Sequence, residues 1–194
     1  MQKMLFLDGN VLPDDLSFSK HLMDRFYETA KNLNKYDLNR IDLNKTEHSR
    51  IFLTKETLNT YYNDINSDKW INLLKETDIL VLSSSMINFG PSVVVKNFID
   101  SISVANKTFS YKYSKKGDAI GLLTNLTVIL VTSQGAPEGW YPHNNNEQWL
   151  IGTFKFLGAK VHHIGQYGTK VDPLKSEGPT KHIDELKDKF KELI

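Results

Sequence analysis

The chain contains no cysteine among its 194 residues. This absence excludes disulfide bonds, thiol-based redox chemistry, cysteine-ligated zinc and iron–sulfur clusters. Any redox chemistry that the protein performs must therefore come from a bound cofactor. The chain also lacks the glycine-rich dinucleotide fingerprint G-x-G-x-x-G and the Walker pattern G-x-x-x-x-G-K-[ST], so neither of those phosphate loops is present.

An excess of charge of one sign is missing as well. The net charge at pH 7 is +1 and no basic stripe occurs, so the sequence does not indicate nucleic acid or an anionic membrane as a partner. No apolar run approaches the roughly 20 residues that span a bilayer, and the apolar part of MQKMLFLDGN is too short for a signal peptide. We therefore expect a cytoplasmic protein.

What the chain does contain is a regular alternation of apolar runs and amphipathic stretches. Hydrophobic residues make up 40% of the chain and charged residues 24%, as in ordinary globular proteins. Runs typical of buried or half-buried strands occur at 4–7, 36–43, 78–84, 126–133 and 160–168. Helical spacing of apolar residues occurs at 18–33, within 54–76, and at 92–102, 144–158 and 179–194.

This alternation predicts an α/β fold: a five-stranded parallel sheet with helices on both faces, in three layers. We expect a single domain over residues 1–194, with a hairpin excursion near 106–123, where Thr108, Phe109 and Tyr111 favour extended structure.

Ligands of open parallel sheets bind beyond the carboxyl ends of the strands. Three loops follow strands in this chain: DGNVLPDDLSFS (8–19), SMINFG (85–90) and SQGAPEGWY (133–141). In a sheet with strand order 2-1-3-4-5 these loops are neighbours, so we expect them to form one site.

The first loop ends in Ser17, Phe18 and Ser19, where a helix begins. A helix N-terminus offers free N–H groups and partial positive charge, which favour a phosphate group. The competing interpretation is that Ser17 or Ser19 simply caps the helix.

The other two loops have residues suited to a flat ring. Met86 and Phe89 offer apolar surface and Asn88 offers amide groups, although they could instead pack into the core and form a turn. Gly135, two residues after Ser133, allows the backbone to approach a ligand closely, although it could also belong to an ordinary turn.

Several segments in order, namely SSMINF, KNFIDSI, TFSY, VILVTSQG and FKFLG, resemble the FMN-dependent NADH:quinone oxidoreductase and azoreductase family. The resemblance covers nearly the whole chain and implies a flavodoxin-like homodimer. It further implies an enzyme that takes hydride from NADH or NADPH and reduces quinones or azo compounds by a ping-pong, two-electron mechanism.

The resemblance also implies which residues hold FMN, with no catalytic side chain and no metal. It assigns to the phosphate Asn10, Ser17, Phe18 and Ser19; to the isoalloxazine ring Met86, Ile87, Asn88 and Phe89; and to its pyrimidine edge Ser133, Gln134, Gly135 and Ala136. It places Phe109 and Tyr111 on the substrate side, at the dimer interface.

Three departures from the family pattern keep other functions open. Ile87 replaces a tyrosine, Gly9 and Asn10 replace a serine pair, and Ala136 replaces a second glycine. One alternative is a flavodoxin-like electron carrier, although such carriers are strongly acidic and this chain is nearly neutral. Another is a non-enzymatic family member that has lost FMN.

Overall fold

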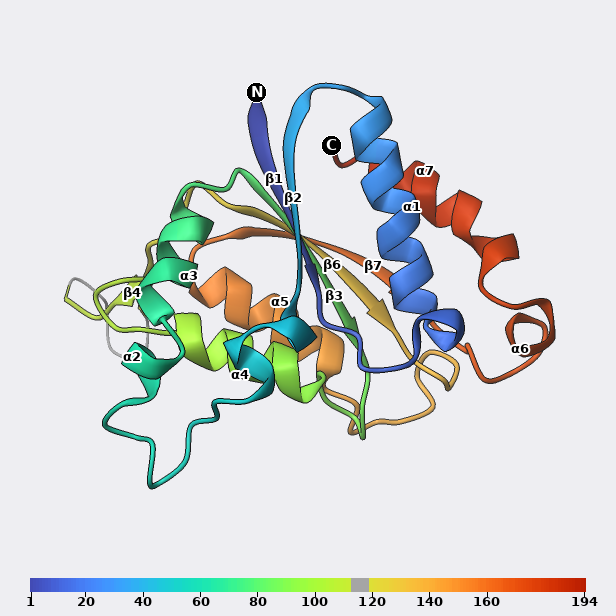
Figure 1. Cartoon of the computed structure of the whole chain (residues 1–194). Helices are drawn as coiled ribbons and strands as arrows, with labels where there is room; N and C mark the ends of the chain where they lie inside the picture. Colours follow the sequence, from blue (N-terminus) through green and yellow to red (C-terminus); the bar gives the residue numbers. More distant parts are fainter. Residues whose placement is uncertain (113–118) are drawn as a thin grey trace.

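The structure is a computed structural model that describes residues 1–112 and 119–194. Five parallel strands form its sheet in the order β2-β1-β3-β6-β7, which confirms the predicted order 2-1-3-4-5 (Figure 1). The strands are β1 (Gln2–Asp8), β2 (Tyr36–Asp42), β3 (Ile79–Ser85), β6 (Thr127–Ser133) and β7 (Lys160–Gln166). The central strand β3 is buried along its whole length, including the three serines Ser83–Ser85 that follow its apolar half.

Helices cover both faces of the sheet, so the predicted α/β class is confirmed (Figure 1). On one face lie α1 (Phe18–Asn32) and α7 (Ile183–Lys191); on the other lie α3 (Ser67–Lys75), α4 (Val93–Ile102) and α5 (Asn146–Phe156).

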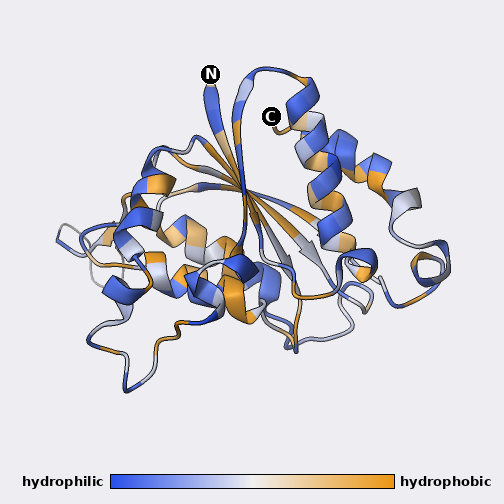
Figure 2. Ribbon diagram, in the orientation of Figure 1, coloured by the Kyte–Doolittle hydropathy of each residue, from blue (hydrophilic) through white to orange (hydrophobic). Residues whose placement is uncertain are grey.

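The period-2 geometry of strands sorts the side chains of β1 between two cores. Leu5 and Leu7 pack under α3, α4 and α5, whereas Met4 and Phe6 pack under α1 and α7. Figure 2 shows apolar residues in the central strands and apolar residues alternating with polar ones along the helices.

Short elements fill the connections. They are α2 (Tyr61–Asp64), α6 (Leu174–Glu177) and the 3-10 turns η1 (Asp14–Leu16), η2 (Leu43–Lys45), η3 (Glu47–Ser49) and η4 (Thr180–His182). The segment 106–123, expected to form a hairpin, contains the antiparallel pair β4 (Phe109–Ser110) and β5 (Ile120–Gly121), while its tip at 113–118 lies outside the described residues.

The parallel arrangement brings the strand ends to one edge. Residues 79–85 of β3 pair in register with 127–133 of β6, so that Ser85 lies opposite Ser133. The loops that follow these two strands therefore leave the sheet side by side. No helix in the described part of the chain is long and apolar enough to cross a membrane.

Candidate functional site

A cavity of about 460 Å³ lies beyond the carboxyl ends of β3 and β6. Cavities of this size are typical of small-molecule sites. Its lining comprises Leu12, residues 85–89 and 133–136, Trp140, Tyr141 and residues 169–171. The structure thus brings together every residue that the sequence predicted in the second and third loops.

The loop after β3 is a tight turn. Ile87 and Gly90 exchange backbone hydrogen bonds of 2.8 and 3.2 Å, and Asn88 and Phe89 between them have positive φ angles of 47° and 75°. Asparagine tolerates that region of backbone space, whereas a bulky residue such as phenylalanine is strained there. The turn holds Phe89 38% exposed at the cavity instead of in the core.

Aromatic rings extend the wall formed by this turn. The ring centroid of Phe89 lies 4.2 Å from that of His143 and 5.2 Å from that of Tyr141. Tyr141 and its neighbour Trp140 line the cavity, and Trp140 is 62% exposed. A flat apolar ring could therefore stack at this rim.

The loop after β6 is braced by the segment that follows β7. The N–H groups of Gly168 and Lys170 donate to the carbonyl oxygens of Ala136 and Gly135, at 2.8 and 3.0 Å. The buried Gln134 side chain is also occupied, since its Nε2 donates to the Ala136 carbonyl and its Oε1 accepts from Asn144. The loop therefore offers a ligand its backbone groups and not the side chain of Gln134.

Two backbone N–H groups of this loop, those of Gly135 and Ala136, donate to no acceptor within the described residues. Buried N–H groups are nearly always paired, so unpaired ones at a cavity wall indicate acceptors supplied by a ligand or by water.

Buried serines join the cavity to the start of α1. Ser133 and Ser85 line the cavity, and Ser133 donates to Ser85 at 3.3 Å. The Ser85 hydroxyl lies 3.0 Å from that of Ser19, which lies 3.2 Å from that of Ser17. Ser17 also accepts from the N–H of Lys20, so the capping interpretation is correct for this side chain.

The first helical turn still presents donors. Ser17 and Ser19 are fully buried and do not line the cavity, and Phe18 does not line it either. However, the N–H groups of Phe18 and Ser19 donate to no acceptor within the described residues. Free N–H groups at the start of a 15-residue helix are suited to an anion.

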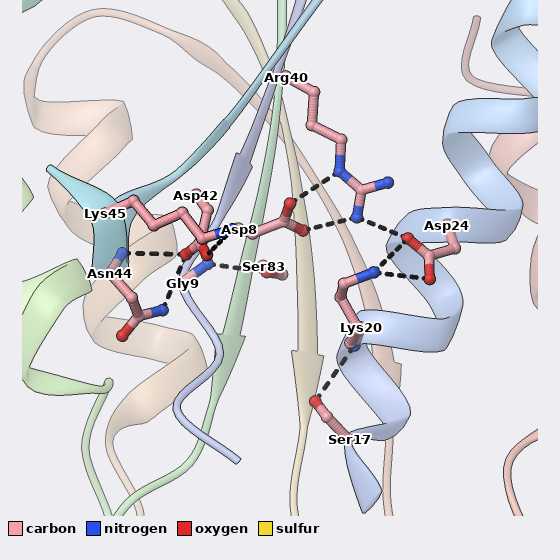
Figure 3. Close-up of polar contacts among 10 residues, drawn as sticks. All are labelled: Asp8, Gly9, Ser17, Lys20, Asp24, Arg40, Asp42, Asn44, Lys45 and Ser83. Atoms are coloured by element: carbon pink, nitrogen blue, oxygen red, sulfur yellow. Dashed lines mark hydrogen bonds and ion pairs between the residues drawn. The ribbon is translucent and has the colours of Figure 1, made fainter. Parts of the chain in front are cut away.

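A network of ion pairs fixes this end of α1 relative to the sheet (Figure 3). Arg40 on β2 donates to both carboxylate oxygens of Asp8 on β1, at 2.7 and 3.0 Å, and contacts Asp24 on α1 at 2.8 Å. Lys20 donates to both oxygens of Asp24, at 2.6 and 2.7 Å. Burial raises the pKa of Asp24, but the hydrogen bonds from Lys20 and Arg40 outweigh it, so that the pKa falls below its usual value.

Gly9 and Asn10 occupy the first loop for different reasons. Gly9 donates its N–H to Ser83 at 3.0 Å and accepts from the Ser92 hydroxyl at 2.5 Å, in a space with no room for a side chain. Asn10 is buried and lines a second, polar cavity of about 560 Å³ beyond β1 and β2, and its Oδ1 has no hydrogen-bond partner in the described residues.

Phe109 and Tyr111 lie elsewhere. Neither lines the cavity; Phe109 packs against Tyr111 and Phe156, with centroid distances of 5.4 and 5.0 Å. Figure 1 shows β4 near α2 and α3, away from the loops that follow β3 and β6. Within one chain, these residues are therefore separate from the candidate site.

The segment 169–171 also lines the cavity, although no motif in the sequence points to it. It does so because β7 is parallel to β6 and ends at the same edge of the sheet. The signal that could have found it is the strand order, since the loop after the fifth strand also emerges there.

Comparison with known proteins supports the expected family. A family model described as a flavodoxin-like fold matches residues 2–190. The chain is 50% identical over 189 residues to the FMN-dependent NADH:quinone oxidoreductase of Mycoplasmopsis synoviae, covering 96% of this chain and 95% of that protein. It is 44% identical over 190 residues to the FMN-dependent NADH:quinone oxidoreductase of Mycoplasma mycoides subsp. mycoides, covering 97% and 96%.

Solved structures show the same fold. An azoreductase from Bacillus anthracis str. Sterne superposes with a TM-score of 0.81 at 19% identity, covering 100% of this chain and 98% of that one. An FMN-dependent NADH-azoreductase from Bacillus anthracis str. Ames Ancestor, solved in complex with FMN, gives 0.76 at 21% identity, covering 100% and 99%. The extent of the identity and the shared strand order together establish that this chain belongs to the FMN-dependent NADH:quinone oxidoreductase family, whose fold is flavodoxin-like.

Proposed function

We propose that this chain binds FMN at the carboxyl edge of its sheet and catalyses the reduction of a quinone by NADH. The observation that carries the proposal is the cavity in which residues 86–89 and 133–136 meet. Relatives that are up to 50% identical over almost the whole chain are named FMN-dependent NADH:quinone oxidoreductases.

The residues present fit FMN. The cavity has the volume and the aromatic rim that a flat ring requires. The unpaired N–H groups of Gly135 and Ala136 would bond the polar edge of the ring, and those of Phe18 and Ser19 would bond the phosphate. Asn10, which the resemblance assigns to the phosphate, lines the second cavity, which shares Leu12 with the first, and its unpartnered Oδ1 would accept a hydrogen bond from a ligand hydroxyl there.

The departures from the family pattern leave this fit intact. Ala136 can serve through its backbone, because a change of side chain does not remove its unpaired N–H group. Ile87 donates its own N–H to Gly90, but it still lines the cavity and offers an apolar side chain there. Gly9 is required by close packing against Val95 and the Ser83 carbonyl, so it is a structural position. These observations favour an FMN-binding member over one that has lost the cofactor.

Bound FMN would supply the acceptor for a hydride, that is, for two electrons and one proton from the dihydronicotinamide, and the transfer would add one negative charge to the ring. The chain positions the partners and supplies hydrogen-bond donors to the charge that develops. Phe89, Trp140 and Tyr141 shape the rim, where nicotinamide and acceptor would stack. One cavity serving both in turn implies ping-pong kinetics, with NADH or NADPH as donor and quinones or azo compounds as acceptors.

A homodimer would explain the positions of Phe109 and Tyr111. They lie outside the cavity of their own chain, so a substrate-side role requires that they reach the cavity of a second copy. Sedimentation velocity tests this directly: a dimer is expected, and a monomer at catalytic concentrations would remove the proposed role of both residues.

The function is tested with the purified protein. We expect a yellow protein, or a colourless one that binds FMN with micromolar or tighter affinity, and NADH-dependent reduction of a soluble benzoquinone. Double-reciprocal plots at several quinone concentrations should be parallel. The proposal is wrong if FMN does not bind, and the carrier alternative is favoured if FMN binds but NADH does not reduce it rapidly.

A further inference from the structure

The cavity has an uneven charge distribution. Of the described residues that line it, Lys170 is the only charged one; the others are apolar, amide, hydroxyl or glycine residues. Within the described part of the chain, Lys170 takes part in no ion pair, in contrast to Lys20, which is bound to Asp24. The cavity therefore carries one uncompensated positive charge.

The backbone of Lys170 is fixed at this wall. Its N–H donates to the Gly135 carbonyl at 3.0 Å. Of the two residues before it, Thr169 donates its N–H and its hydroxyl to the Gln134 carbonyl, at 3.1 Å each, and Gly168 donates its N–H to the Ala136 carbonyl at 2.8 Å. The segment 168–170 is thus bonded residue by residue to the loop after β6.

The stem of the side chain lies across Gly135. A Cβ added to this glycine would lie 3.0 Å from Cδ and 3.1 Å from Cγ of Lys170, which is tighter than nearly all real contacts. A glycine at 135 therefore leaves room for the lysine stem. The aliphatic part of the lysine lies against Gly135, whose N–H and that of the next residue, Ala136, are unpaired within the described residues.

Two unpaired N–H groups and one uncompensated cation at the same wall form an edge suited to an anion. On the proposed function, the group at this wall is the pyrimidine edge of the flavin, which gains a negative charge when hydride arrives. Building on that function, we propose that Lys170 contacts this edge and stabilises the charged, reduced cofactor over the neutral, oxidised one.

Lys170 would favour the reduced state of the cofactor over the oxidised state. A cation adds little to the binding of the neutral, oxidised ring, because that ring carries no net charge to attract it. It adds more to the binding of the anionic, reduced ring, because two opposite charges attract each other. Lys170 is exposed to solvent, which screens the Coulomb attraction, so we expect the preference to be no more than about tenfold. For a two-electron couple, a tenfold change corresponds to about 30 mV in midpoint potential.

The test compares Lys170→Met with Lys170→Arg and with the control Lys175→Met. Methionine keeps an unbranched stem to cover Gly135 but has no charge, and arginine restores the charge. Lys175 lies on α6, does not line the cavity and gives the same change in net charge. Each full-length variant is titrated with oxidised FMN and, anaerobically, with chemically reduced FMN, and the midpoint potential is measured.

We expect Lys170→Met to bind oxidised FMN nearly as wild type does, to bind reduced FMN about tenfold more weakly, and to shift the potential by about 30 mV to more negative values. Lys170→Arg and Lys175→Met should both resemble wild type. Equal potentials in Lys170→Met and Lys175→Met would overturn the inference while leaving the proposed function standing. Failure of the wild-type protein to bind FMN in either state would overturn both.

Discussion

At Gly9, in the first loop, the structure leaves no room even for the methyl group of an alanine. A Cβ there would lie 2.1 Å from Cγ2 of Val95 and 2.4 Å from the Ser83 carbonyl oxygen. We predict that Gly9→Ala lowers the free energy of unfolding by about 1–3 kcal/mol, because overpacking forces α4 and β3 apart. Urea denaturation measures the effect.

Gly152 provides the matched control for this prediction. It lies inside α5, and a Cβ added to it would meet no atom within 4 Å. Gly152→Ala should raise the free energy of unfolding by up to about 1 kcal/mol, because alanine favours the helix. If both variants unfold at the same urea concentration, the steric account of Gly9 is wrong.

Ser85 is the residue through which the start of α1 and the cavity wall are joined. Its hydroxyl contacts those of Ser19 and Ser133, at 3.0 and 3.3 Å, and all three side chains are buried. We predict that Ser85→Ala costs about 1–3 kcal/mol of unfolding free energy, because buried hydroxyls lose their partner. The exposed Ser176→Ala on α6 should unfold as wild type does; an equal loss in both variants would contradict the prediction.

At the scale of elements, a buried polar cluster attaches η3 to α4. The ring of His48 is fully buried, with Nε2 3.0 Å from the Ser101 hydroxyl and Nδ1 3.0 Å from the Thr46 hydroxyl. Asn97 on α4 donates to the carbonyl oxygens of His48 and Ile51, at 2.8 and 2.6 Å. This segment is therefore fixed by hydrogen bonds as well as by apolar packing.

This cluster predicts a dependence of stability on pH. Burial lowers the pKa of His48 from 6.5 to about 4, an effect that Glu47 opposes and Lys69 assists. Because the unfolded chain takes up a proton near pH 6.5 and the folded chain only near pH 4, the contribution of neutral His48 is complete above pH 6.5. It is lost as the pH falls towards 4, with an upper limit of about 3 kcal/mol.

Urea denaturation between pH 7 and pH 4.5 checks this expectation. His48→Gln can keep hydrogen bonds but has no titrating ring, so its unfolding free energy should fall less over that range than that of wild type. Parallel pH profiles for the two proteins would show that His48 does not contribute through its protonation.

The elements themselves illustrate what a sequence pattern predicts well. The expected strand at 126–133 and the observed β6 at Thr127–Ser133 differ by one residue, because an uninterrupted apolar run has few alternatives to a central strand. The closing helix was expected over 179–194, but its regular part is Ile183–Lys191, preceded by a 3-10 turn. The four-residue α6 had no periodic pattern long enough to predict it.

At the scale of the whole molecule, the proposed cofactor should stabilise the fold. FMN would bridge loops after β1, β3 and β6, none of which forms a site in the unfolded chain. We predict that FMN at 100 times its dissociation constant raises the unfolding free energy by about 2.7 kcal/mol. Thermal denaturation with and without FMN measures this, with riboflavin, which lacks the phosphate, as the control. An unchanged melting temperature would contradict the proposed site.

By itself, the sequence pattern determined the α/β class and the edge of the sheet at which the loops lie, because apolar periodicity is local and parallel strands end together. The strand order, which brings residues 86–89 and 133–136 together, followed from the resemblance to a flavodoxin-like family. Tertiary structure alone decided that the Ser17 and Ser19 hydroxyls face inward, that Gly9 has no room for a side chain, and that Lys170 reaches the cavity. These depend on contacts between segments far apart in the chain, such as the bond from Lys170 to Gly135, and no local pattern encodes them.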